Sequence, residues 1–194
     1  MAANANANSS NELNIVCDAT NVTESKESKE SKDSKDSKIF LNDSWNMYFH
    51  DPYDNSWDDK SYKMVGVISS VDDYVHYFKG FKELLKKGMF FIMRLDIMPR
   101  YEDEMNIKGG CFSFKIMAEE LESKFYALCA NIIGENFANN NDENIIYNIN
   151  GISISPKKFY YIVRIWIKDK KYAKKEYYNF EIPKYSTLMY KNHI

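Results

Sequence analysis

Alternating apolar and polar residues mark several short segments after residue 38. In the segment 111–117, Phe112, Phe114 and Ile116 are apolar, whereas the residues between them are not. Because successive side chains of a strand point to opposite faces, this alternation predicts a sheet with one face packed on helices and the other accessible. The predicted fold class is therefore α+β, with an antiparallel sheet and helices behind it.

The same patterns predict the order of the elements. Apolar residues at helical spacing follow Ser69 and Ser70, which can cap a helix, and Asp72 and Asp73 suit its first turn. Polar loops are predicted at 51–60 and 96–110, and 145–155 and 159–168 are expected to form a hairpin. Strands are predicted at 45–50, 61–69, 89–95, 111–117, 145–155, 159–168 and 187–190, and helices at 71–86, 118–137 and 170–178.

Composition divides the chain into two parts. Residues 1–38 are rich in Asn, Ala and Ser and then repeat Ser-Lys-Glu and Ser-Lys-Asp triplets, so they are predicted to form a disordered tail. Residues 39–194 hold all the Phe, Trp and Tyr side chains and are predicted to fold as one domain.

Charge and cysteine content exclude several classes of function. With 26 basic and 28 acidic residues, the chain does not have the basic excess of a protein that follows a long nucleic-acid backbone. If it binds RNA, it should therefore hold a small, defined feature. The three cysteines and three histidines are scattered, so we expect no disulfide framework, metal or cofactor. No apolar run has membrane-spanning length, and we expect a cytoplasmic protein (in the host cytoplasm, for a viral chain).

Two tryptophans and an acidic segment are candidates for recognition. Trp57 lies in a polar loop, and strand alternation places Trp166 on the accessible face with Arg164. Tyr101 and Glu102 belong to an acidic loop that runs into a pair of glycines. Each feature alone is more typical of a core plug or of solvated surface. Together they suggest a site, because aromatic rings stack on bases and carboxylates accept hydrogen bonds from them.

Specific motifs carry a family resemblance across the folded region. They are Trp45 with His50-Asp51-Pro52, Trp57 in its loop, Val71-Asp72-Asp73-Tyr74, Ile97-x-Pro99, Tyr101-Glu102-Asp103-Glu104 with Asn106-x-Lys108-Gly109-Gly110, Ile133-Gly134-Glu135-x-Phe137, Gly151, Ile165-Trp166, and Tyr190-Lys191-Asn192-His193. In order and spacing, the segment from Phe40 to His193 resembles a divergent member of the translation initiation factor 4E family of mRNA cap-binding proteins. This resemblance implies a curved antiparallel sheet with about three helices on its convex face and a cap-binding slot on its concave face.

The resemblance also implies roles for single residues. Trp57 and Tyr101 would stack on the two faces of 7-methylguanine, although the family usually has tryptophan at the second position. Glu102 would accept hydrogen bonds from the guanine edge, and Trp166 would contact the N7-methyl group. The triphosphate site departs from the family, because Cys111 and Ile162 stand where basic residues are usual. The expected phosphate contacts are Lys157, Arg164, Lys115 and Lys158.

A second surface is implied on the convex face, where family members bind a helical peptide of a scaffold protein or a repressor. Val75 stands where the family usually has tryptophan. The expected partner-binding residues are Val71, Val75, Tyr126, Ala130 and Gly134. The expected partners are therefore capped mRNA and such a peptide, with no membrane and with the protein itself a monomer.

Two other functions remain open at this stage. A cap-binding competitor that repressed translation would share the slot but would not recruit a scaffold. A cap-processing enzyme would need a metal or a nucleophile, and the carboxylates of 102–104 lie in a single loop without a second acidic cluster. No catalytic residue is therefore predicted.

Overall fold

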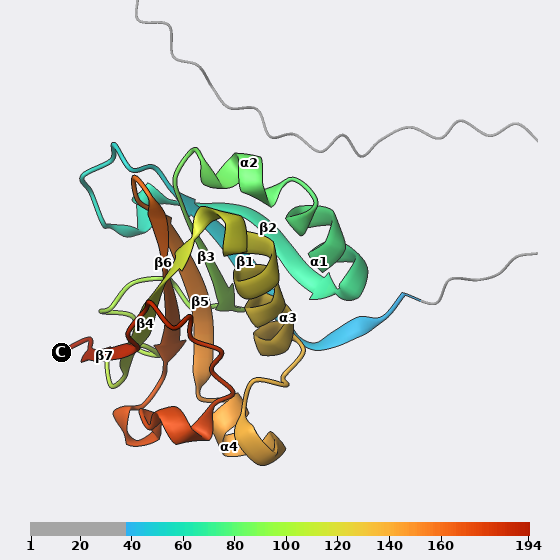
Figure 1. Cartoon of the computed structure of the whole chain (residues 1–194), viewed down its shortest axis with the longest axis vertical. Helices are drawn as coiled ribbons and strands as arrows, with labels where there is room; N and C mark the ends of the chain where they lie inside the picture. Colours follow the sequence, from blue (N-terminus) through green and yellow to red (C-terminus); the bar gives the residue numbers. More distant parts are fainter. Residues whose placement is uncertain (1–37) are drawn as a thin grey trace, which may run out of the picture. The chain divides into compact units, whose positions relative to one another are not determined.

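The computed structural model describes residues 38–194, which form a seven-stranded sheet with helices on one face (Figure 1). The predicted disordered tail lies outside the described residues, apart from Lys38. Neighbouring strands are antiparallel, and their order is β2-β1-β3-β5-β6-β4-β7. The strands are β1 (Phe40–His50), β2 (Tyr62–Ser70), β3 (Met89–Arg94), β4 (Gly110–Met117), β5 (Ile149–Pro156), β6 (Tyr160–Ile167) and β7 (Met189–Asn192). The predicted α+β fold class is confirmed.

Three helices cover one face of the sheet, and a fourth lies at the end of the sheet near the start of β5 (Figure 1). They are α1 (Val71–Phe78), α2 (Phe81–Leu85), α3 (Ala127–Ile133) and α4 (Glu143–Ile146). The main core lies between helices and sheet, where Phe81 and Ile165 are fully buried. The opposite face carries a smaller buried cluster that includes Trp166. Along β6, Ile165 and Trp166 thus point to opposite faces, as the alternation predicts. Within the described part, no helix is long and apolar enough to cross a bilayer.

The first helical segment is interrupted, so the single helix predicted at 71–86 is wrong. Gly80 adopts a non-helical conformation (φ −113°, ψ 5°) and separates α1 from α2. Glycine is a poor helix former, which makes it a natural break. The predicted cap is confirmed, because the Ser70 hydroxyl accepts a hydrogen bond from the backbone N–H of Asp73.

Later elements also differ from their predicted bounds. The helix predicted at 118–137 begins with a 3-10 turn and a wide π-helical turn, and α3 stops at Gly134 because Glu135 has a left-handed backbone (φ 60°). Part of the strand predicted at 145–155 forms α4, which is capped by Asp142. The helix predicted at 170–178 is wrong: two 3-10 turns are separated by Lys174, whose backbone is extended (φ −103°, ψ 122°), and Tyr178 forms a β-bridge with Ala138. The last strand begins two residues later than predicted, at Met189.

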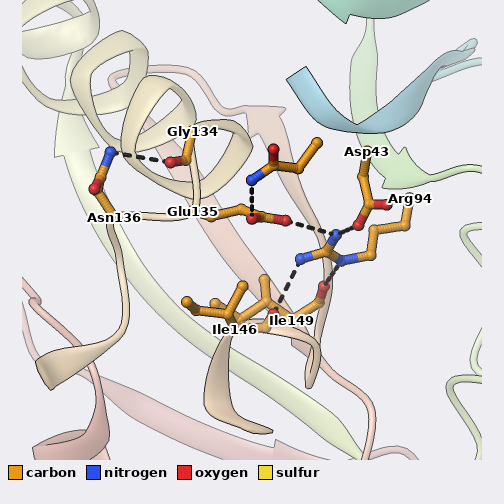
Figure 2. A network of polar contacts seen from close by, with 8 residues as sticks. Asp43, Arg94, Gly134, Glu135, Asn136, Ile146 and Ile149 are labelled. Atoms are coloured by element: carbon orange, nitrogen blue, oxygen red, sulfur yellow. Dashed lines mark hydrogen bonds and ion pairs between the residues drawn. The ribbon is translucent and has the colours of Figure 1, made fainter. Parts of the chain in front are cut away.

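A buried arginine ties the end of α3 to the sheet (Figure 2). Arg94, at the end of β3, forms ion pairs with Asp43 and Glu135. It also donates to the backbone carbonyls of Ile146 (3.1 Å) and Ile149 (2.8 Å). A buried guanidinium needs hydrogen-bond and ionic partners, and this network supplies four of them from separate segments. The network therefore fixes the turn after Gly134, next to the predicted partner-binding face.

Candidate ligand-binding cleft

A cleft of about 660 Å³ opens on the side of the sheet that carries the smaller buried cluster. Its lining comes from the β1–β2 loop, the β3–β4 loop, the β5–β6 turn and the strands between them. It brings together six of the predicted site residues, although they are far apart in the sequence. These are Trp57, Tyr101, Glu102, Lys157, Arg164 and Trp166.

Trp57 forms one wall of the cleft and is backed by a histidine. Its ring stacks on His50, with 4.0 Å between ring centroids and 12° between planes. His50 is fully buried, and its Nε2 hydrogen bonds to the Ser56 carbonyl at 2.9 Å. Trp57 itself is 53% exposed. One face of the indole is thus covered by His50, while the exposed remainder faces the cleft.

The loop that carries Trp57 is held by its own acidic residues. Asp54 accepts from the backbone N–H of Ser56, and Asp58 accepts from those of Lys60 and Ser61. The hydrogen bond with Ser56, together with those from Lys60 and Ser61, lowers the pKa of Asp58. These side chains act as local turn and cap residues. The polar sequence around Trp57 is therefore explained by the folding of the loop, which leaves the indole at the cleft.

Tyr101 forms the second wall and is also backed by a histidine. It is 45% exposed, and its ring stacks on His193 with 4.7 Å between centroids. The Trp166 ring lies on the same side, with its centroid 5.3 Å from that of Tyr101. Sequence reasoning did not assign a role to either backing histidine. The only signal was that both belong to motifs of the resemblance, His50-Asp51-Pro52 and Tyr190-Lys191-Asn192-His193.

In the acidic segment, some side chains stabilise the loop and another lines the cleft. Asp103 accepts from the backbone N–H groups of Met98 (3.1 Å) and Met105 (2.8 Å), one with each carboxylate oxygen. Buried Asn106 donates to the carbonyls of Met98 and Arg100, both at 2.8 Å. These bonds fold the loop. Glu102, by contrast, is exposed and lines the cleft.

Trp166 differs from its prediction. It lies on the predicted side of the sheet, but it is 2% exposed and not open to solvent. The expectation of an open side chain is wrong because Tyr101 and His193 pack over the indole. Its Nε1–H donates to the Ser153 hydroxyl at 3.0 Å, which satisfies its polar group. Trp166 therefore forms the apolar floor of the cleft.

The predicted cations are not all at the cleft. Lys157 and Arg164 line it, and the Arg164 guanidinium lies 3.4 Å from the Ser155 hydroxyl. Lys115 and Lys158 are not among the lining residues. Their ammonium groups lie over the rings of Tyr160 and Phe159, at 4.8 Å and 5.1 Å. Two aromatic walls, an apolar floor, a carboxylate and these two predicted cations thus face one space, which Arg100 also lines.

A comparison with protein families identifies the family of the chain. The family model described as "Eukaryotic initiation factor 4E" matches residues 40–193, which is nearly all of the described domain. The chain belongs to the eukaryotic initiation factor 4E family. Its fold and the motifs on which the sequence resemblance rested agree with this membership.

Individual factor 4E proteins are distant relatives of this chain. The factor 4E of Eremothecium gossypii is 28% identical over 141 residues, and that of Candida albicans is 29% identical over 140. These matches cover 69% and 66% of this chain, and the chain spans 64% of the length of each relative. The sequence is therefore a divergent one within the family.

Solved factor 4E structures share the fold. The complex of C. elegans eIF4E-3 with the 4E-binding protein Mextli and cap analog aligns with a TM-score of 0.66 at 19% identity, covering 81% of this chain and 94% of that one. The complex of Ascaris suum eIF4E-3 with m7G cap aligns at 0.63 and 19% identity, covering 81% and 93%. At this identity, the likeness concerns the fold of the chain.

The face of this factor 4E domain that is covered by helices carries the residues predicted to bind a partner. On α1, Val71 and Val75 are exposed, at 41% and 58%. At the other helix, Ala130 and Gly134 are exposed, and Tyr126 is half-buried. The hydroxyl of Tyr74 donates to the Tyr126 carbonyl at 2.7 Å and joins the two helical segments. The residues predicted to bind a partner thus lie on two elements, α1 and the segment around α3.

Proposed function

We propose that this chain binds the 7-methylguanosine cap of mRNA in the cleft, and that it acts in cytoplasmic translation initiation through a scaffold partner. The observation that carries this proposal is the joint placement of Trp57, Tyr101 and Glu102 around one cleft. N7-methylation gives guanine a positive charge, so stacking on electron-rich rings gains a cation–π contribution that unmethylated guanine lacks. A base–aromatic stack contributes roughly 1–3 kcal/mol.

The other lining residues complete the recognition. Glu102 accepts from the N1–H and N2–H groups of guanine, which adenine does not offer in that arrangement. The indole of Trp166 presents an apolar surface to the N7-methyl group, because its N–H is already bonded to Ser153. Lys157 and Arg164 meet the triphosphate. Lys115 and Lys158 are at most outer contacts, since their ammonium groups lie over neighbouring rings.

The exposed side chains of Val71 and Val75, with Ala130 and Gly134, form the proposed docking face for a helical peptide of a scaffold or repressor. Val75 offers a smaller apolar side chain than the tryptophan that is usual in the family. This smaller side chain favours a partner whose docking surface differs from that of the usual scaffold. It also favours a competitor that binds caps without recruiting that scaffold. Addition to a cap-dependent translation extract separates these roles, because an initiation factor restores translation and a competitor inhibits it.

A cap-processing enzyme has less support. Both carboxylate oxygens of Asp103 accept from backbone N–H groups, so this residue is committed to the loop. Within residues 38–194, no group of three or more His, Cys, Asp or Glu side chains is placed to hold a metal ion. A labelled cap analogue incubated with the protein and magnesium should be recovered intact; release of product would establish an enzyme.

Tryptophan fluorescence provides the deciding experiment. Of the three tryptophans, Trp57 and Trp166 line the cleft, whereas Trp45 is fully buried away from it, so quenching by a ligand reports on the two cleft tryptophans. Titration with a 7-methylguanosine triphosphate should quench strongly, and the unmethylated nucleotide should bind far more weakly. By calorimetry, Trp57→Ala should bind about 10- to 100-fold more weakly, and Glu102→Gln should lose preference for guanine over adenine. Equal binding of both nucleotides by the wild type would refute the proposal.

A further inference from the structure

A hydrogen-bonded chain holds the ring behind Tyr101. His193 stacks on Tyr101 with 25° between the ring planes. Its Nδ1 lies 2.8 Å from the backbone carbonyl of Asn106, and its Nε2 lies 3.2 Å from the sulfur of Cys111. Both nitrogens of the imidazole are thus engaged, so the plane of the ring is fixed from two sides.

The partners determine the protonation of this imidazole. A carbonyl can only accept, so Nδ1 carries the hydrogen and donates to Asn106. Nε2 is then an acceptor, and the thiol of Cys111 donates to it. Burial raises the pKa of Cys111, which keeps the thiol protonated. Desolvation lowers the pKa of His193, although the Asn106 hydrogen bond and the nearby Glu102 act in the opposite direction. The neutral ring and the protonated thiol are therefore mutually consistent.

Strand pairing holds Cys111 and His193 next to the floor of the cleft. Cys111 on β4 is directly opposite Trp166 on β6 and opposite Lys191 on β7. The backbone N–H of His193 donates to the carbonyl of Gly109 at 3.1 Å. The position of the imidazole is therefore set by the β4–β7 ladder, which is continuous with the floor. Trp57 has a separate support in His50, which does not depend on β7.

We propose that His193, oriented by the thiol of Cys111 and the carbonyl of Asn106, is the positioning residue for Tyr101 as the second stacking wall. This inference rests on the proposed cap-binding function. A single phenol ring at the edge of a cleft can rotate about its side-chain bonds, and a fixed flat ring behind it limits that rotation. Cys111 then contributes to binding through the orientation of Tyr101 and not through a charge that meets phosphate.

A double-mutant cycle on cap-analogue affinity tests the proposal. His193→Ala should weaken binding of the methylated analogue about three- to tenfold. In a Tyr101→Ala background, His193→Ala should weaken binding by less than about twofold more, because the ring that His193 positions is gone. In a Trp57→Ala background, it should keep its full effect. His76→Ala, which removes an exposed histidine from α1, is the matched control and should change nothing.

Substitutions of Cys111 test the orienting bond without removing the imidazole. Cys111→Ala should show part of the affinity loss of His193→Ala. Cys111→Ser retains an O–H donor and should bind the cap analogue as tightly as wild type. If His193→Ala fails to fold, the comparison of Cys111→Ala with Cys111→Ser still tests the positioning role of His193. Equal losses in the wild-type and Tyr101→Ala backgrounds, or equal affinities of Cys111→Ala and wild type, would overturn the proposal. If the wild type itself fails to prefer the methylated analogue, the cap-binding function fails instead.

Discussion

Arg100 and Asp59 form an ion pair, with 2.9 Å between Nη1 and Oδ1, that joins the loop of Tyr101 to the loop of Trp57. Each partner lies within two residues of a stacking ring. A pair this exposed contributes less than about 1 kcal/mol to stability. Its effect is geometric, because it favours the arrangement in which the two loops lie together across the cleft.

Neutralising this pair should weaken cap binding without unfolding the protein. Asp59→Asn and Arg100→Met should each lower affinity for the methylated analogue about two- to fivefold at low salt. The difference from wild type should shrink as salt is raised, because exposed charges are screened. Calorimetry at two ionic strengths measures this effect. Lys86→Met removes a comparable exposed pair with Glu83 on α2 and should leave affinity unchanged. A salt-independent loss would contradict the electrostatic explanation.

Of the four lysine and arginine residues predicted to contact phosphate, two line the cleft and two do not. Lys157→Ala and Arg164→Ala should each weaken binding of the triphosphate analogue several-fold and flatten its salt dependence, because fewer ions are displaced on binding. The monophosphate analogue should be less affected. Lys115→Ala and Lys158→Ala are matched controls, since their ammonium groups lie over aromatic rings. If the controls lose as much affinity as Lys157→Ala, the phosphate path runs elsewhere.

A charge on the exposed face of α1 should separate partner binding from cap binding. Val75→Asp should reduce recovery of a helical scaffold peptide by tenfold or more, in about the range of a lost hot-spot residue. Its affinity for the cap analogue should equal that of wild type, because Val75 is not among the residues that line the cleft. Pull-down with parallel fluorescence titration tests both points. His76→Asp places the same charge on the neighbouring exposed position of the helix and should retain the partner.

Acid should weaken the start of α1 through Asp73. Partial burial would raise its pKa, but hydrogen bonds from Ser70 and Ser69 outweigh this effect and lower the pKa from 3.8 to about 2. Between these pH values the unfolded chain binds more protons than the folded one, so this contribution to stability is present above about pH 4 and is lost as the pH falls towards 2.

Asp73→Ala should therefore lower the free energy of unfolding by roughly 1 kcal/mol at neutral pH. It should also flatten the dependence of that free energy on pH between about 4 and 2, measured by urea denaturation. Asp72→Ala, an exposed neighbour in the same helical turn, is the control. An unchanged pH profile in the Asp73 variant would show that its hydrogen bonds do not contribute.

Strand alternation predicted the side of the sheet on which each residue of β6 lies, because that side depends only on local geometry. The exposure of Trp166 could not be predicted, because Tyr101 and His193 cover it from segments distant in sequence. Lys158 was expected at the cleft because of its neighbour Lys157, yet the turn directs its ammonium group over Phe159. Local sequence patterns thus predicted the sheet face on which a side chain lies. Its burial and the groups that it contacts depended on tertiary packing.

The alternation along β6 also restricts how the floor of the cleft can change over evolutionary time. β6 is paired on both sides, and its turn closes with a hydrogen bond from the N–H of Lys157 to the carbonyl of Tyr160 at 2.8 Å. An insertion of one residue before Arg164 would exchange the faces of the strand residues that follow it, directing Arg164 into the main core and Ile165 towards the cleft. Insertions of two residues would keep both faces. Natural length variants of this strand should therefore differ by even numbers of residues, or should carry a bulge that absorbs the odd one.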